Sequence, residues 1–384
     1  MALRECKLTM TEFSVLLVSG ASLSVYGGRE RWIMEVAKLM RYFSPVTVIS
    51  LAGHHKERLD RLKLIQAQIM KHGVTYHEIK TVKTNLKIIK RIPISFHKLA
   101  KIVMQHQKIY VAGDLFFGIF FSLLALFLGK RGLIIGLHVS PSIRRLRYAS
   151  PILKILNRLH AIKAIHVVNI GDLTRLKCLV GAKVTYIPNF VDCTVFRPVV
   201  VKRNDVFNVL FVGALEFNKG IDVFLKVAEQ IKKDFPNTRF IIASYGGSWE
   251  RHVRKYAESG LVEYKGFITD EDLIRLYCES HLLMMPSREE PFGLVAIEAQ
   301  ACGTPVISSN LPSFQLTVKD GLTGLRVKNR EVIDEWLKAF KKIYDLWRHD
   351  AQAYNSMCNR AREHICKNFY FNVMKNIIKL LLIS

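Results

Sequence analysis

Unbroken runs of Val, Ile and Leu, each followed by a segment with helical periodicity, recur along almost the whole chain. In the first half the runs are FSVLLVS (13–19), VTVISLA (46–52), VTYHEI (74–79), KIYVAG (108–113), LIIGLHV (133–139) and AIHVVN (164–169). In the second half they are NVLFVGA (208–214), RFIIASY (239–245), LVEYKGF (261–267), LLMMP (282–286) and PVISS (305–309). Apolar strands that alternate with helices are typical of parallel sheets buried on both faces. The pattern therefore predicts an α/β fold.

The length of the chain and one internal segment predict two domains. A chain of 384 residues is too long for one ordinary hydrophobic core. Between the two sets of strands lies IPNFVDCTVFRPVVVKRND (187–205), whose prolines and charged end suit a linker. We therefore expect two doubly wound, Rossmann-like domains, residues 1–190 and 191–366, that face a cleft. Open parallel sheets bind ligands beyond the carboxyl ends of their strands, so the site is expected in that cleft.

Two glutamates mark a candidate site in the second half. Glu290 and Glu298 bracket seven residues within REEPFGLVAIEAQACGTPV (288–306), which is patterned as a loop followed by a helix. Gly303 and Pro305 then end the helix. One carboxylate thus precedes the helix, and the other lies about two turns inside it.

The start of this helix has the features of an anion site. The N–H groups of Phe292, Gly293 and Leu294 lie at its N-terminus, where the helix dipole favours a group such as a diphosphate. Gly293 lets a ligand approach the backbone closely. Carboxylates accept hydrogen bonds from hydroxyls, so Glu290 is suited to a group attached to that phosphate and Glu298 to a ribose. The alternative is an ordinary helix-start acid at Glu290 and an exposed surface residue at Glu298.

The segment PSREEPFGLVAIEAQACGTPVISSN (286–310) resembles the signature of family 4 glycosyltransferases, retaining enzymes of the GT-B fold with an E-x7-E motif. Four other segments resemble further parts of that family, in the family's order. They are SGASLSVYGGRERWIMEVAKLM (19–40), TYIPNFVDCTVFRP (185–198), FVGALEFNKGIDVFLKVAEQI (211–231) and GLTGLRVK (321–328). The resemblance covers most of the chain. It implies retaining transfer of a sugar from a nucleotide-diphosphate-sugar donor to a hydroxyl of a glycan or lipid-linked acceptor.

The same resemblance implies roles for single residues in the second domain, which holds the donor in this family. Glu290, with the backbone of Phe292 and Gly293, would hold the donor sugar, and Glu298 would hold the ribose. Lys219 would bind the diphosphate and stabilise the charge that grows on the leaving group. The alternative for Lys219 is a solvated lysine before a helix-starting glycine.

One position departs from the family's pattern. The family usually has an arginine five residues before the lysine, whereas this sequence has Ala214. Two cations bind a diphosphate more strongly than one, so either donor binding is weaker here or another residue substitutes. Arg288 and Arg29 are the candidates for that substitution. The departure leaves open a catalytically weak transferase-like protein.

The first half contributes a glycine pair and a histidine. Gly27 and Gly28 precede a helix with one apolar face, and the resemblance implies that their loop closes over the sugar or the diphosphate. The alternative is a simple turn. His138 ends the run LIIGLHV, where the family often has a histidine near the donor sugar. It is a candidate catalytic residue, though not a general base, and the alternative is a structural histidine.

No group of residues has the spacing of metal ligands. His54 and His55 stand in a polar stretch without paired acids. The acids of DED (270–272) are interpreted as charges at a helix N-terminus. We therefore expect no metal cofactor, which also fits the family.

Most of the positive charge lies in the first half. Residues 1–190 contain 30 Lys/Arg against 9 Asp/Glu, whereas residues 191–384 contain 27 against 23. Basic and apolar residues alternate in KTVKTNLKIIKRIPISFHKLAKIVMQHQK (80–108) and RRLRYASPILKILNRLHAIK (144–163). Such segments favour an anionic membrane surface, unless they are only solvated helix faces. We expect a peripheral membrane protein.

Two other functions compete with this interpretation. Nucleic-acid binding predicts aromatic residues among the basic ones as stacking platforms, and segment 80–108 contains only Phe96. No nucleic-acid partner is therefore expected. A nucleotide-sugar epimerase of the same fold is the second alternative.

Cysteine usage and apolar runs predict the location. The seven cysteines are scattered singly with no C-x-x-C, which favours reduced thiols and argues against disulfides and zinc. The first residues, MALRECKLTM, lack the apolar core of a signal peptide. The longest apolar run, LFFGIFFSLLALFL (115–128), is shorter than the ~20 residues of a membrane span, so a buried helix is expected. These features predict a cytoplasmic protein on the inner face of the membrane.

The end of the chain is expected to form a separate helix. The segment KNFYFNVMKNIIKLLL (367–382) has the apolar content of a packed helix. The resemblance implies that residues 367–384 cross back to the first domain.

Overall fold

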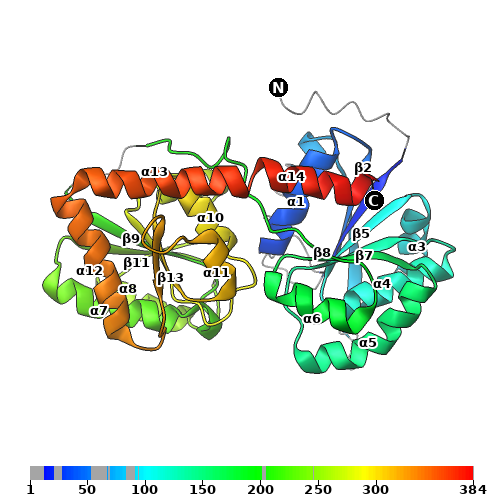
Figure 1. The fold of residues 1–384 in the computed structure, drawn as a ribbon, viewed down its shortest axis with the longest axis horizontal. Coiled ribbons are helices and arrows are strands. Elements are labelled where there is room, and N and C mark those ends of the chain that lie inside the picture. Colours follow the sequence, from blue (N-terminus) through cyan, green and yellow to red (C-terminus); the bar gives the residue numbers. More distant parts are fainter. Residues whose placement is uncertain are drawn as a thin grey trace. The chain divides into compact units, whose positions relative to one another are not determined.

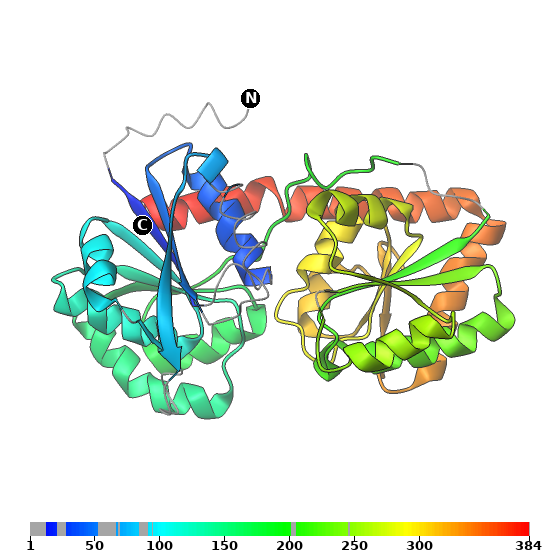
Figure 2. The same ribbon diagram turned by 180° about the vertical axis from the view of Figure 1, so that it is seen from behind.

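The computed structural model describes residues 13–20, 28–52, 67, 70–83, 91–93, 95–200, 205–244 and 246–383. These form two compact units: one contains the chain up to Pro188 and the segment from Met374 onward, and the other contains Asn189–Val373. In each unit, Figures 1 and 2 show a sheet with helices on both faces. The first boundary lies within two residues of the one expected from sequence, and the returning segment begins at Met374 instead of 367.

The first unit is built on a mostly parallel sheet with the order β4-β3-β2-β1-β5-β6-β7-β8. Its strands are β1 (Val15–Ser19), β2 (Val46–Ala52), β3 (Thr75–Lys83), β4 (Arg91–Pro93), β5 (Lys108–Gly113), β6 (Leu133–Leu137), β7 (Ile162–Val167) and β8 (Val184–Tyr186). Its neighbours pair in parallel, apart from β3 with β4 at one edge. The order reverses between β1 and β5, as in a doubly wound fold.

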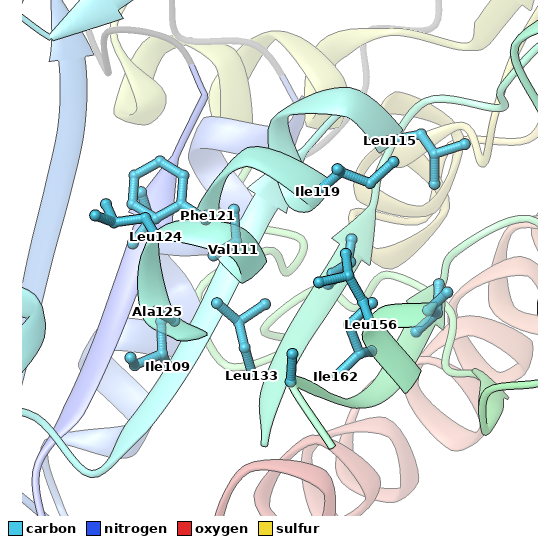
Figure 3. Packing of buried hydrophobic residues seen from close by; sticks show 14 of the residues in the cluster. Ile109, Val111, Leu115, Ile119, Phe121, Leu124, Ala125, Leu133, Leu156 and Ile162 are labelled. Carbon is cyan, nitrogen blue, oxygen red and sulfur yellow. The ribbon is translucent and has the colours of Figure 1, made fainter. Parts of the chain in front are cut away.

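Helices cover both faces of this sheet. They are α1 (Gly28–Met40), α3 (Phe96–Met104), α4 (Leu115–Phe127), α5 (Ile143–Arg158) and α6 (Ile170–Val180). The apolar run predicted to be a buried helix is α4, and Figure 3 shows its Leu115, Ile119 and Phe121 in one buried hydrophobic cluster that also contains Val111 of β5. No helix in the described part of the chain is both long enough and apolar enough to cross a bilayer.

The second unit repeats the doubly wound order, β11-β10-β9-β12-β13-β14, with every described pair parallel. Its strands are β9 (Phe207–Val212), β10 (Thr238–Ala243), β11 (Glu263–Gly266), β12 (Leu282–Met285), β13 (Val306–Ser309) and β14 (Gly324–Val327). The order reverses between β9 and β12. Ligands of such sheets bind beyond the strand ends at this switch point.

Two hydrophobic clusters, one on each face of the sheet, hold the second unit together. On one face lie α7 (Ile221–Asp234), α8 (Glu250–Glu258), α12 (Ile333–His349) and α13 (Ala351–Asn368). On the other face lie α9 (Asp270–Glu279), α10 (Leu294–Ala301) and α11 (Pro312–Thr317). The acids of residues 270–272 occupy the first turn of α9, where the Thr269 side chain caps the helix, so they are N-terminal charges as predicted.

The end of the chain belongs to the first unit. Helix α14 (Phe371–Ile378) continues into η4 (Lys379–Ile383), a short π-helical turn that lies against β5. Ile377 and Leu381 are buried there. Apolar side chains thus join this segment to the first unit.

The cysteine prediction was wrong in one respect. Cys193 and Cys366, which are 173 residues apart in sequence, form a disulfide with a Cα–Cα distance of 5.8 Å. The bond ties the segment after Asn189 to α13 within the second unit. No spacing pattern relates two such distant cysteines, so the sequence did not reveal the pair. Cysteine usage therefore no longer argues for a reducing compartment.

Candidate functional site

Two loops meet at the switch point of the second unit. The loop after β9 leads through η3 (Phe217–Lys219) into α7, and the loop after β12 leads into α10. The backbone N–H groups of Arg288 and Glu289 donate to the carbonyl of Asn218, at 2.8 and 3.2 Å. These bonds hold Lys219 beside the loop that carries Glu290.

Gly220 makes the close approach of the two loops possible. Its φ is +73°, and a Cβ at this position would lie 2.0 Å from the carbonyl oxygen of Pro286. A residue with a side chain would clash with this backbone and would also be strained at this φ. The glycine therefore lets the backbone next to Lys219 lie against Pro286, which follows β12.

Lys219, Glu290 and Gly293 form one polar cluster. The Nζ of Lys219 lies 2.8 Å from Oε2 of Glu290, with side chains that are 28% and 12% exposed. The backbone N–H of Gly293 donates to Oε1 of the same carboxylate at 3.2 Å. The carboxylate thus bridges an ammonium group and the N-terminus of α10, where the helix dipole attracts negative charge.

This geometry changes one part of the sequence interpretation. Of the amides predicted to receive an external anion, that of Gly293 is already bonded to a carboxylate of the chain. The sequence interpretation required the Gly293 amide to be open to an external anion, and it is not open, because the Glu290 carboxylate holds it. A ligand phosphate at this position must share Lys219 with Glu290 or displace the Glu290 carboxylate from the lysine.

The backbone around Gly293 is shaped by aromatic packing. Gly293 has φ +91°, and a Cβ there would lie 2.7 Å from the Phe314 ring. Phe292 is 3% exposed, and its ring packs against Phe369 with centroids 5.8 Å apart. The Phe292 side chain therefore faces the core, so only its backbone is available to a ligand. Leu294 is the first residue of α10.

Glu298 is not the exposed surface residue of the alternative interpretation. It is 3% exposed, and the hydroxyl of Tyr277 donates to its Oε2 at 2.9 Å. A buried carboxylate requires such partners. Tyr277, in α9, was not identified from the sequence, because no spacing relates it to the motif.

Arg288 has a structural role and does not supply the missing cation. Its guanidinium donates to both carboxylate oxygens of Asp222, to both of Glu331 and to the carbonyl of Phe217, which engages all five of its N–H groups. It also stacks 3.7 Å above the Phe217 ring. The hydrogen bonds to Asp222, followed by those to Glu331, raise the pKa of Arg288. No N–H group of Arg288 therefore remains for a diphosphate.

The candidates from the first half of the sequence lie in the first unit or outside the described residues. Gly27 lies outside the described residues, and Gly28 begins α1. His138 follows β6, is 6% exposed and lies 3.1 Å from the Tyr110 hydroxyl through its Nε2. The side chain of Arg29 lies outside the described residues.

Ala214, the position that departs from the family's pattern, lies in the second unit and is half-buried in the loop after β9.

No metal centre is found among the residues that the structure describes. They contain no group of three or more His, Cys, Asp or Glu that is arranged to hold an ion. His54 and His55 lie outside the described residues.

The second unit matches a known protein family. Residues 194–364 match the family described as glycosyl transferases group 1. A D-inositol 3-phosphate glycosyltransferase of Paenarthrobacter aurescens is 31% identical over 192 residues, 46% of this chain and 46% of that protein. A glycogen synthase of Mycobacterium tuberculosis is 28% identical over 193 residues, 49% of this chain and 45% of that protein. The chain thus matches about half the length of these relatives.

Solved structures share the fold of nearly the whole chain. Sucrose-phosphate synthase from Thermosynechococcus elongatus is 20% identical with a TM-score of 0.71, covering 96% of this chain and 98% of that one. The Anabaena protein HepE in complex with UDP-glucose is 17% identical with a TM-score of 0.75, covering 97% of this chain and all of that one. At these identities the likeness establishes the fold.

Proposed function

We propose that this chain, which has the GT-B fold and whose residues 194–364 belong to the glycosyl transferases group 1, is a retaining glycosyltransferase. It moves a sugar from a nucleotide-diphosphate-sugar donor to a hydroxyl of a glycan or lipid-linked acceptor. The observation that carries the proposal is the cluster of Lys219, Glu290 and Gly293 at the switch point of the second sheet. The cluster lies inside the segment that matches the family.

In this proposal the diphosphate binds to Lys219 and to the N-terminus of α10. The ammonium opposes the negative charge that grows on the leaving diphosphate as the glycosidic bond breaks. The helix dipole acts in the same direction. The complex of HepE with UDP-glucose supports a donor of this class.

Glu290 and Glu298 have separate tasks in the proposed complex. When a diphosphate competes for Lys219, the Glu290 carboxylate is released toward hydroxyls of the transferred sugar. Glu298, held by Tyr277, accepts a hydrogen bond from the ribose. The backbone of Phe292, Gly293 and Leu294 completes the donor site.

His138 and the charge of Lys219 complete the proposal. His138, in the first unit, stays a candidate catalytic residue, as the family resemblance implies. Lys219 and the α10 dipole supply the positive charge that a metal ion supplies in other transferases. Activity is therefore proposed to persist in the presence of a chelator.

The test is a panel of nucleotide-sugars with and without saccharide or lipid-linked acceptors. The proposal expects nucleotide release that depends on an added acceptor, and a product whose anomeric configuration equals that of the donor. Conversion of a nucleotide-sugar without acceptor would identify an epimerase instead. Inversion at the anomeric carbon would contradict the retaining mechanism.

Ala214→Arg is expected to tighten binding of the nucleoside diphosphate. A charge-assisted hydrogen bond contributes about 1.5 kcal/mol, which corresponds to about tenfold in Kd. Ala214→Gln is the matched neutral control, and titration calorimetry measures both. Equal Kd values for the two variants and the wild type would show that position 214 does not face the diphosphate.

We propose that α5 docks on an anionic membrane surface. Its buried side, which includes Leu146 and Leu153, packs into the core. Its outer side exposes the apolar residues Ile143, Tyr148, Ile152 and Ile155 among the basic residues Arg144, Arg145, Arg147, Lys154 and Arg158. The helix contains no acidic residue. A solvated face does not need exposed isoleucines, whereas an interfacial helix inserts them beside lipid phosphates.

Neutralising Arg144, Arg145 and Arg147 with alanine is expected to weaken binding to vesicles that contain phosphatidylserine. At about 1 kcal/mol for each basic residue near the surface, the triple variant loses on the order of 100-fold in partitioning. The control is a triple alanine variant at Lys338, Lys341 and Lys342, exposed positions of α12. Co-sedimentation equal to wild type, or binding to oligonucleotides but not to vesicles, would contradict the membrane role.

A further inference from the structure

One arginine binds the chain on both sides of Lys219. Arg288 lies in the loop after β12, and its backbone N–H donates to the carbonyl of Asn218 at 2.8 Å. Its Nη1 donates to the carbonyl of Phe217 at 2.7 Å and to Oδ1 of Asp222 at 2.7 Å. Phe217 and Asn218 directly precede Lys219 in the chain, and Asp222 follows it in the first turn of α7. Arg288 therefore holds the segment from which the Lys219 side chain projects.

A second carboxylate completes the arrangement. Nε and Nη2 of Arg288 donate to the two carboxylate oxygens of Glu331 at 3.0 and 2.7 Å, and Nη2 also donates to Oδ2 of Asp222 at 2.9 Å. Glu331 lies between β14 and α12. The arginine side chain, which is 12% exposed, thus joins the start of α7 to the segment before α12. Bidentate pairs with two carboxylates leave the planar guanidinium one orientation.

Arginine is the residue whose donors match this arrangement. A lysine ammonium carries its three N–H donors on one atom, whereas a guanidinium offers five in a fixed fork. Arg288 uses one N–H for each of its five side-chain bonds, and its plane stacks 3.7 Å above the Phe217 ring. Without the guanidinium, Asp222 would be a carboxylate that is 8% exposed and lacks this cation. Both η3 and the start of α7 would lose the side chain that joins them to the loop after β12.

We propose that Arg288 is a positioning residue of the donor site, which sets the Lys219 ammonium where it meets the diphosphate. The role in transfer rests on the proposed function, whereas the contacts around Lys219 do not depend on it. Arg288 does not bind the substrate itself, because all five of its side-chain N–H groups are engaged within the chain. A displacement of about 1 Å at a catalytic group costs on the order of 100-fold in rate, so the fixed segment around Lys219 matters for transfer.

The first experiment tests these contacts without any substrate. Amide hydrogen exchange is compared between the wild type and Arg288→Lys, which keeps the charge and loses the fork. The amides of Gly220 and Glu289, both bonded to carbonyls of η3, are expected to exchange about tenfold faster in the variant. Arg254→Lys, at an exposed arginine paired with Glu250 in the same unit, is expected to change neither rate. Equal exchange in the wild type and Arg288→Lys would overturn the proposal, whether or not the protein transfers sugar.

The second experiment tests whether Arg288 acts through Lys219. Arg288→Met is expected to lower kcat/KM about 100-fold and to weaken binding of the nucleoside diphosphate, with Arg288→Lys between this variant and the wild type. In the Lys219→Met background, Arg288→Met is expected to change both quantities less than about threefold, because the group that it positions is gone. A purely structural arginine would lower both by the same factor in either background, and that additive result would overturn the positioning role.

Glu331→Gln decides the question if Arg288→Met does not fold. Glu331 is 53% exposed, so its amide variant is expected to fold while it loses the charge that orients the guanidinium. Its kcat/KM is expected to fall about tenfold, and to stay unchanged when Lys219→Met is already present. An equal fall in both backgrounds, or none in either, would overturn the positioning role. Absence of transfer by the wild type would overturn the proposed function instead, and the exchange rates would then decide whether Arg288 holds η3.

Discussion

Lys219→Met is expected to lower kcat/KM for sugar transfer about 100- to 1,000-fold, the loss typical when one preorganised charge donor is removed from a transition state. Methionine keeps the length of the side chain and removes its charge. The leaving diphosphate then loses the ammonium that lies 2.8 Å from Glu290 at the switch point. The thermal unfolding midpoint is expected to stay near that of the wild type, because the Lys219 side chain is 28% exposed and an ion pair that solvent reaches contributes little stability.

Lys226→Met is the matched control for this variant. Lys226 is an exposed residue of α7, the helix that follows η3 in the chain. It is expected to transfer sugar at the wild-type rate. Equal activity of Lys219→Met and Lys226→Met would remove Lys219 from the catalytic site.

Glu290→Ala is expected to lower turnover about 100-fold with the fold intact. The carboxylate joins Lys219 to the Gly293 amide and is the proposed partner of the sugar hydroxyls. Its removal frees the Gly293 amide and Lys219 for a phosphate, so the Kd of the nucleoside diphosphate is expected to stay equal or to fall. Initial rates at saturating donor report the change in turnover separately from the change in nucleotide affinity.

Glu289→Ala is the neighbouring control, because this acid is exposed in the same loop. It is expected to behave like the wild type in both measurements. Unchanged turnover in Glu290→Ala would count against the assignment of the E-x7-E motif to catalysis.

The sequence predicted the architecture because the signals involved are local. Most parallel strands are apolar runs bounded by turns, and runs such as KIYVAG and LIIGLHV became β5 and β6. The GT-B fold is confirmed, and the glycosyltransferase resemblance is confirmed for residues 194–364. The short strands β4, β8 and β14 were missed, since three or four residues at a sheet edge are too few to form a recognisable run.

The sequence did not predict contacts between distant side chains. Arg288 was a reasonable substitute for the missing arginine by position, and only the structure shows that Asp222 and Glu331 already occupy its guanidinium. The disulfide and the Tyr277–Glu298 bond were missed for the same reason. Each depends on the three-dimensional packing of elements that lie far apart in the chain.

Titration calorimetry of a panel of nucleoside diphosphates, with wild type and Lys219→Met side by side, tests the central claim most directly. The claim is that the cluster of Lys219, Glu290 and Gly293 binds a nucleotide diphosphate. The account predicts that one nucleobase binds preferentially and that Lys219→Met weakens its binding. A ligand at 100 times its Kd is expected to stabilise the wild-type fold by about 2.7 kcal/mol. Binding of no nucleoside diphosphate, or equal affinity in both proteins, would contradict it.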